Sequence, residues 1–163
     1  MTEPADSTPI TEAQFIDVPR DADLKALHQY WDSKRDGRLM PRRADIEPAE
    51  IPKLLPHIIM YNVLRNGGGY TNRLVGGEIV NFAGRNGTGE PAGSCMPPRA
   101  AAMMTGILDA VTVERTPKFR AGKAHWHPDK AYREFEACFL PLSSDGDTVD
   151  VILGAIKFPL AGL

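Results

Sequence analysis

Residues 70–91 read Tyr-Thr-Asn-Arg-Leu-Val-Gly-Gly-Glu-Ile-Val-Asn-Phe-Ala-Gly-Arg-Asn-Gly-Thr-Gly-Glu-Pro, and this stretch decides the fold. Its first part, residues 70–75, has the composition of a strand. A glycine pair then interrupts the strand, a short helix is expected at 78–84, and a glycine-punctuated loop follows. We expect the glycines to act as hinges between strand and helix, not as a loop that cradles a ligand.

The residues before and around this stretch predict a β-hairpin. Residues 57–64 are rich in β-branched and aromatic side chains, which favour a strand. Residues 65–69 read Arg-Asn-Gly-Gly-Gly and supply the turn, because asparagine and glycine accept positive φ angles. Residues 70–75 then return as the second strand.

The last third of the chain predicts three antiparallel strands: residues 119–127, 132–142 and 148–158. In the second of these, Phe135 and Phe139 share one face, whereas Glu134 and Glu136 lie on the other. This alternation is typical of a sheet with one face in the core and the other in solvent.

Two longer helices are expected. Leu24, Leu27 and Trp31 recur at helical spacing over residues 21–33, which indicates an amphipathic helix. The clearest helix is 99–114, which follows Pro98. Its expected apolar stripe consists of Ala102, Met103, Gly106, Ile107, Ala110 and Val111.

Length and composition indicate one soluble domain. The chain has 163 residues, enough for one core but too few for two comfortable domains, and its formal net charge of −2 gives no reason to expect nucleic-acid binding. No apolar run approaches the roughly 20 residues that cross a bilayer. The polar N-terminus is unlike a secretory signal. We expect a cytoplasmic protein with a flexible tail at 1–20, ordered only briefly at Phe15 and Ile16, and a single domain at 21–163.

The predicted order is strand, strand, short helices, longer helix and three further strands. Seven sequence motifs accompany this order: Leu27-His28-Gln29-Tyr30-Trp31, Arg35-Asp36-Gly37-Arg38, residues 40–46, residues 51–56, Arg73-Leu74-Val75-Gly76, residues 84–89 and Phe139-Leu140-Pro141-Leu142. Order and motifs together resemble a PAS-like domain family of alphaproteobacteria, over about residues 21–158. The resemblance implies an α+β fold with a five-stranded antiparallel sheet, helices on one face and an N-terminal amphipathic helix. It also implies a role in signalling, with no catalytic motif and no shared cofactor.

A fold of this kind leaves room for a small molecule between the sheet and the helices at 78–84 and 99–115. The side chains expected to line this pocket are Ile79, Phe82, Met103, Ile107, Phe119, Phe135, Phe139, Leu153 and Ile156. Most of them must also fill the core, because a sheet of this size needs close packing.

The N-terminal helix offers a possible contact surface. It carries Tyr30 and Trp31, which are more large apolar side chains than a lone surface helix requires. Together with Leu24 and Leu27 they could form a homodimer or a protein-partner surface. The alternative is that the helix packs on the domain's own sheet, and the sequence favours neither.

His125 and His127 are the residues with metal-ligand spacing. On a strand, residues two apart point to the same face, so two imidazoles could share an ion. Asp129, Glu134 and Glu136 could add ligands across the hairpin. A complete site would need more ligands than this pair supplies, so an exposed hairpin tip is the favoured interpretation.

Haem and flavin are not expected, and the sequence requires no cofactor. Neither His28 nor His57 falls where a haem ligand on the main helix would lie, and residues 99–116 contain no histidine. A flavin photosensor would need cysteine in an Asn-Cys-Arg-Phe-Leu-like context, whereas Cys95 lies in Gly-Ser-Cys-Met-Pro-Pro and Cys138 on a strand. Both are expected to be unreactive thiols that form no disulfide framework.

The cations of residues 34–43 could bind phosphate, but Asp45, Glu47 and Glu50 are close enough to neutralise them, and a solvated face is the expected role. No hydrolase or phosphate-loop motif is complete, so we expect no enzyme. The favoured hypothesis is a bacterial regulatory module that senses a small apolar ligand or works by protein contact. The alternatives are an interaction adaptor with a packed, ligand-free core and, less favoured, a metal-binding protein that uses His125 and His127.

Overall fold

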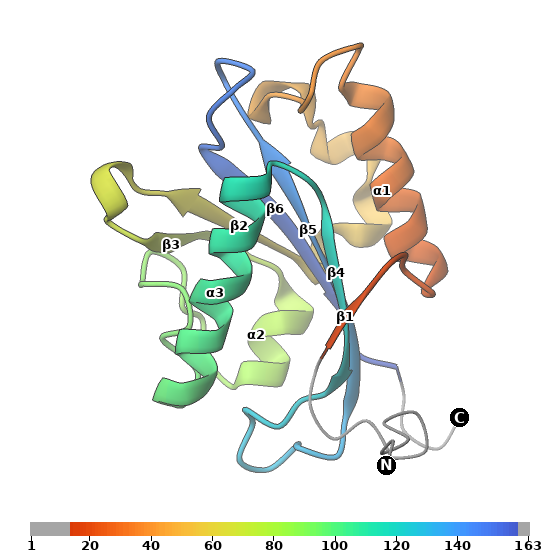
Figure 1. The fold of residues 1–163 in the computed structure, drawn as a ribbon. Coiled ribbons are helices and arrows are strands. Elements are labelled where there is room, and N and C mark those ends of the chain that lie inside the picture. The colour runs from red at the N-terminus through yellow and green to blue at the C-terminus, as the bar shows by residue number, and fades with distance from the viewer. Residues whose placement is uncertain (1–13, 160–163) are drawn as a thin grey trace, which may run out of the picture.

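The computed structural model describes residues 14–159, and within them six strands form one antiparallel sheet in the order β1-β4-β5-β6-β2-β3 (Figure 1). The strands are β1 (Gln14–Ile16), β2 (Ile58–Val63), β3 (Tyr70–Val75), β4 (Lys118–Lys123), β5 (Glu134–Leu142) and β6 (Val151–Lys157). The five expected strands are all present, but the prediction of a five-stranded sheet is wrong because the sheet has a sixth strand. The sixth, β1, comes from the segment predicted to be a tail and pairs with β4 through Phe15 and Arg120. The rest of the predicted tail, residues 1–13, lies outside the described residues.

The strand predicted at 119–127 ends at Lys123. Beyond it the backbone bonds locally, since His125 N–H donates to the Lys123 carbonyl at 2.8 Å and His127 N–H donates to the Ala124 carbonyl at 3.0 Å. These short-range bonds replace the ladder to β5, so His125 and His127 lie in a turn and not on a strand.

Helices cover both faces of the sheet, which corrects the expectation of helices on one face. They are α1 (Ala22–Lys34), α2 (Gly77–Ala83) and α3 (Pro98–Glu114), with single-turn or short 3-10 helices at Arg43–Asp45, Pro48–Glu50, Pro52–His57 and Arg65–Gly67. In Figure 1, α2 and α3 lie in front of the sheet and α1 lies on the other side of β4 and β5. Both α1 and α3 contact β5, so this strand is covered from two sides.

The start of α1 is held by a carboxylate that the sequence placed in solvent. Glu136, on β5, is only 6% exposed. Its Oε1 accepts hydrogen bonds from the backbone N–H groups of Arg20 and Asp21, both at 2.7 Å, and its Oε2 lies 3.2 Å from Arg20 Nε. Because a buried carboxylate requires several donors, α1 and the sheet face beneath it stabilise each other.

The rest of α1 packs on the same face. Leu24 and Leu27 are fully buried, and Trp31 Nε1 donates to the Pro141 carbonyl of β5 at 2.9 Å. The packing alternative for α1 is therefore the one found, and these three side chains are not available as a partner surface. Tyr30 stays half-exposed, and its hydroxyl donates to Glu50 Oε1 at 2.7 Å.

An ion pair also joins α1 to the last strand. Lys157 Nζ, at the end of β6, lies 2.6 Å from Asp23 Oδ2 in the first turn of α1. This hydrogen bond from Lys157 holds the pKa of Asp23 below its ordinary value.

Two glycines shape the passage from β3 to α2. Gly76 N–H donates to the Ile58 carbonyl at 2.7 Å, and a Cβ at position 76 would lie 2.4 Å from the Pro56 carbonyl oxygen. Gly84 ends α2 with φ of +87°, a conformation that favours glycine. The structure thus gives these glycines the hinge role expected from the sequence.

The buried stripe of α3 differs from the predicted one. It consists of Met104, Ile107, Leu108 and Val111. Met103, which was predicted to face inward, is 45% exposed. The predicted stripe was built on Met103, whereas Met104 is the buried methionine. The buried face of the helix is therefore rotated by about one residue relative to the expectation.

We predict that Glu136→Ala lowers the free energy of unfolding by about 2 kcal/mol, because it leaves buried backbone donors without their charged acceptor. Urea unfolding followed by far-UV circular dichroism measures this. The matched control is Glu134→Ala, an exposed glutamate on the same strand, which should change the free energy by less than about 0.5 kcal/mol. Equal losses in the two variants would contradict the tethering role of Glu136.

Candidate functional site

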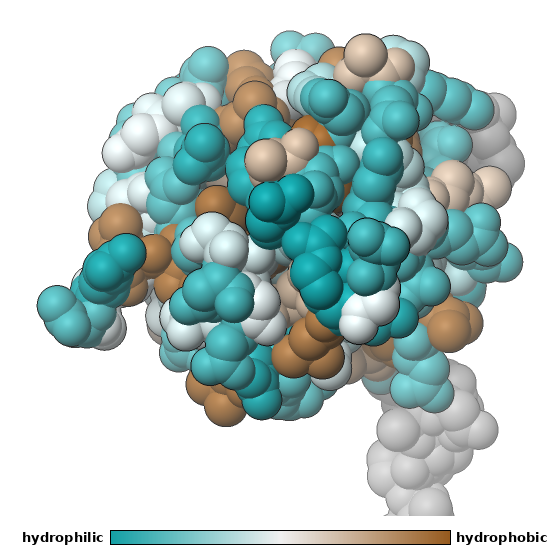
Figure 2. Space-filling model, turned by 90° about the horizontal axis from the view of Figure 1, so that it is seen from above, coloured by the Kyte–Doolittle hydropathy of each residue, from teal (hydrophilic) through white to brown (hydrophobic). Residues whose placement is uncertain are grey.

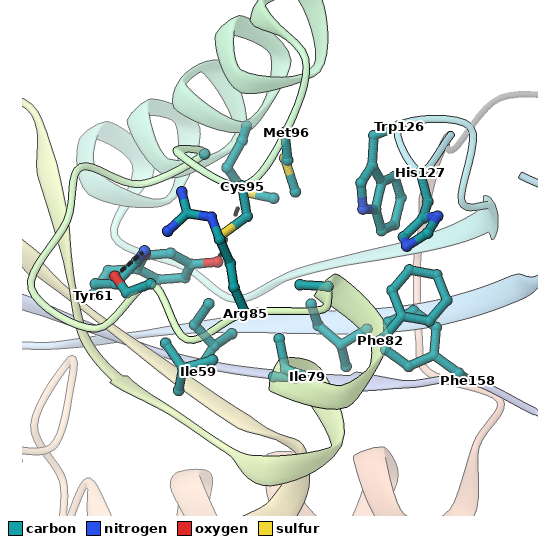
Figure 3. Close-up of a pocket in the computed structure, with 17 residues that line it drawn as sticks. Ile59, Tyr61, Ile79, Phe82, Arg85, Cys95, Met96, Trp126, His127 and Phe158 are labelled. Atoms are coloured by element: carbon teal, nitrogen blue, oxygen red, sulfur yellow. Dashed lines mark hydrogen bonds between the residues drawn. The ribbon is translucent and has the colours of Figure 1, made fainter. Parts of the chain in front are cut away.

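A small, partly open cavity of about 70 Å³, called the smaller cavity below, lies between α2 and the sheet (Figure 3). Its walls come from β2, β3, α2, the loop before α3, the β4–β5 turn and the end of β6. The lining residues are Ile59, Tyr61, Asn72, Val75, Ile79, Phe82, Ala83, Arg85, Gly87, Gly93, Cys95, Met96, Met104, Trp126, His127, Ile156 and Phe158.

Aromatic rings close one end of this cavity. Phe82 of α2 stacks on Phe158 with ring centroids 3.9 Å apart, and the His127 ring meets Phe82 edge-on at 5.0 Å. Trp126 packs edge-on against Phe135 at 4.8 Å. Figure 3 shows Trp126 and His127 reaching from the β4–β5 turn toward Phe82 and Phe158. The turn is thereby fixed to α2 by ring packing instead of by strand pairing.

The same cavity contains two buried polar groups. Tyr61 is almost completely buried, which raises the pKa of its phenol, and its hydroxyl lies 3.9 Å from Met104 Sδ. Asn72 is 5% exposed, and its Nδ2 donates to the Gly87 carbonyl at 3.0 Å. Within residues 14–159, Asn72 Oδ1 has no hydrogen-bond partner. The cavity can therefore hold a water molecule or a polar group that satisfies these atoms.

A second and larger hollow of about 460 Å³ opens between α3 and strands β4 and β5. Its lining residues are Met96, Pro97, Arg99, Ala100, Met103, Met104, Arg120, Lys123, His125, Trp126, Phe135, Ala137, Phe139 and Ile156. Met96, Met104, Trp126 and Ile156 line both spaces and form the partition between them. Methionine side chains adapt their shape readily, so this partition can adjust to an occupant.

The structure brings six of the nine predicted pocket residues to these two spaces. Those that line one or both are Ile79, Phe82, Met103, Phe135, Phe139 and Ile156. Ile107 is a core residue of α3 that lines neither space.

Phe119 and Leu153 were assigned to the pocket but lie on the opposite face of the sheet. Phe119 pairs with Cys138 and meets the His28 ring of α1 edge-on at 5.0 Å. Leu153 is paired with Leu140 on β5. Side chains alternate along a strand, so neither can point to the face that carries Phe139 and Ile156.

Several lining residues were not anticipated. The stretch 70–91 was expected to supply only Ile79 and Phe82 to the pocket, but Asn72, Arg85 and Gly87 also line the smaller cavity. Their signal was the glycine-rich loop that folds back on β3, where Asn72 N–H donates to the Glu90 carbonyl at 2.8 Å. No sequence pattern marked Arg99, Arg120 or Trp126, because they meet only in the folded chain.

The histidine pair does not form the metal site considered from the sequence. His127 Nδ1 accepts hydrogen bonds from Asp129 N–H at 3.0 Å and Lys130 N–H at 3.1 Å, which organise the turn. His127 lines the smaller cavity and His125 the larger hollow. Across residues 14–159, no group of three or more histidine, cysteine, aspartate or glutamate side chains is placed to hold a metal ion.

The basic segment at 34–43 is neutralised locally, as expected. Lys34 Nζ lies 3.0 Å from Glu50 Oε1, while Arg38 and Arg42 both pair with Asp45 at 2.7 and 3.0 Å. The hydrogen bonds from Arg42 and Arg38 hold the pKa of Asp45 well below its ordinary value. Among the helices that the structure describes, none has the length and apolar character needed to cross a membrane.

The two cysteines differ in environment. Cys138 is fully buried on β5, and burial raises the pKa of its thiol to about 12. Cys95 is half-buried and lines the smaller cavity, which is partly open. Because the thiolate is the reactive form, the two residues should differ strongly in reactivity.

We predict that Ellman's reagent labels Cys95 of the folded protein at mildly alkaline pH and leaves Cys138 unlabelled until the protein is unfolded. Cys95→Ser should abolish labelling of the folded state, and the matched variant Cys138→Ser should leave it unchanged. Labelling of folded Cys95→Ser protein would show that Cys138 is accessible.

One known family matches nearly all of the described chain. Residues 20–157 match the sequence model of a family described as PAS domain. A solved structure described by the words "Flavin Analogue Sheds Light on Light-Oxygen-Voltage Domain Mechanism" is similar with a TM-score of 0.43 and 12% sequence identity, over 69% of this chain and 86% of that chain. No curated protein matches. The family match spans most of the chain, and the chain therefore belongs to the PAS domain family.

Proposed function

We propose that this protein is a non-catalytic regulatory PAS module that binds a small, mainly apolar molecule between α3 and the sheet. The observation that carries the proposal is the hollow of about 460 Å³ beside the smaller cavity. Its volume lies in the range of small-molecule sites, and its floor contains Phe135, Phe139 and Ile156. Membership of the PAS domain family supports a role in signalling.

The competing function is an interaction adaptor whose core is filled by its own side chains. The larger hollow favours ligand binding over this alternative, because its volume and its apolar lining are those of small-molecule sites. The proposal also includes contact with a protein partner, because such a contact would transmit the binding of a ligand to the rest of a signalling pathway. Figure 2 shows one end of the molecule, where hydrophobic residues are scattered among hydrophilic ones and form no broad patch. A partner surface is therefore better sought elsewhere on the domain.

Native mass spectrometry of protein purified from its source tests the proposal. We expect a reproducible added mass that disappears on denaturation. Ala100→Trp, on the α3 wall of the hollow, should greatly lower the fraction of protein that carries the added mass, because the indole fills the space. The matched control is Ala102→Trp, two residues along the same helix at an exposed position, which should keep the mass. A clean mass for the unmodified chain would favour the adaptor.

A further inference from the structure

The lining of the larger hollow includes three cationic side chains, those of Arg99, Arg120 and Lys123, and none of the described residues that line it is acidic. Apart from His125, the other lining residues are apolar or aromatic and include Phe135 and Phe139. The hollow thus has a cationic edge next to an apolar floor, an arrangement that matches an amphipathic anion.

Arg120 belongs to this edge by its position in the sheet. It pairs with Ala137, whose side chain faces the hollow, and it is only 8% exposed. Its Nη2 lies 3.6 Å from Met103 Sδ, which places the guanidinium between β4 and α3. Its guanidinium carbon also lies 5.5 Å from the centre of the Phe15 ring. Burial lowers the pKa of Arg120.

Arg99 lies on α3 one turn before Met103, so its guanidinium can reach the same edge as that of Arg120. A cation in the first turn of a helix is opposed by the helix dipole, and α3 has no acidic residue there. Arg99 therefore lies at a position that is unfavourable for helix stability. An anion bound in the hollow would interact favourably with this arginine and would offset that cost.

The N-terminus of α3 reinforces this edge. Pro97 is the N-cap and makes no side-chain hydrogen bond to the helix. The next N–H groups, those of Arg99 and Ala100, precede the first intrahelical bond, which Ala101 N–H donates to the Pro97 carbonyl at 2.9 Å. Arg99 and Ala100 both line the hollow, so the positive end of the helix dipole lies beside the same space as the arginines.

From this geometry we propose that the ligand is an amphipathic anion whose carboxylate binds between Arg99 and Arg120 and whose hydrocarbon chain lies on the floor of Phe135, Phe139 and Ile156. This inference rests on the proposed function. The hydrocarbon chain belongs in the larger hollow, because the smaller cavity beyond Met104 has little volume and contains the polar groups of Tyr61 and Asn72. Charge-assisted hydrogen bonds hold the carboxylate, and burial of the chain supplies the remaining affinity.

Isothermal titration calorimetry of ligand-stripped protein with octanoate and 1-octanol tests the proposal, since the two probes share a chain length and differ in charge. We expect octanoate to bind at least about ten-fold more tightly, as hydrogen bonds to a charged group predict. Arg99→Gln should remove most of this difference without affecting 1-octanol. Arg65→Gln, an exposed arginine in the β2–β3 turn, makes the same change in net charge and should alter neither affinity.

Arg99 is the test position because it is exposed, so its substitution should leave the fold intact, whereas Arg120 is buried. Equal affinities for octanoate and 1-octanol would overturn the anionic ligand and leave the proposed apolar pocket standing. Binding of neither probe would overturn both. Loss of octanoate affinity in Arg65→Gln as large as in Arg99→Gln would show that net charge, and not the site, attracts the anion.

Discussion

Strand β5 is buried on both faces, and the rest of the structure depends on this constraint. Every residue from Phe135 to Leu142 is buried. Because side chains alternate along a strand, one set forms the floor of the hollow under α3 and the other set holds α1. Glu136 faces α1, whereas Phe135 and Ala137, the residues on either side of it, line the hollow. The hollow under α3 and the N-terminal helix therefore lie on opposite faces of the same strand, and a change in the position of β5 would affect both.

The elements were predictable wherever a local pattern carried them. The strands β2 and β3, the hairpin between them and the helix α1 follow from β-branched runs, glycine positions and the helical spacing of apolar residues. The layers were not predictable in the same way. Alternation of Phe135 and Glu136 was interpreted as core against solvent, but α1 covers the second face and the carboxylate binds the N–H groups that precede the helix. A polar residue in a strand pattern does not say whether water or a helix terminus will satisfy it.

The pocket prediction failed where it ignored strand geometry. Leu153 and Ile156 are three residues apart on one strand, so they cannot face the same side, yet both were assigned to the pocket. That error could have been avoided from the sequence alone. The role of Trp126 and His127 could not, because it depends on a turn held by ring packing on Phe82. Non-local contacts of this kind leave no periodicity in the chain.

Net charge was a poor guide to local electrostatics for the same reason. The formal charge of −2 describes the whole chain. Folding pairs the cations that are close in sequence, such as Arg38 and Arg42 with Asp45, and these residues present little net charge to a ligand. Arg99 and Arg120 are far apart in sequence and meet at the edge of an apolar hollow. Charge-assisted hydrogen bonds are strong in a partly desolvated site. Arg99 and Arg120 can therefore matter more for recognition of an anion than the five cations of residues 34–43, although they do not form a cluster in the sequence.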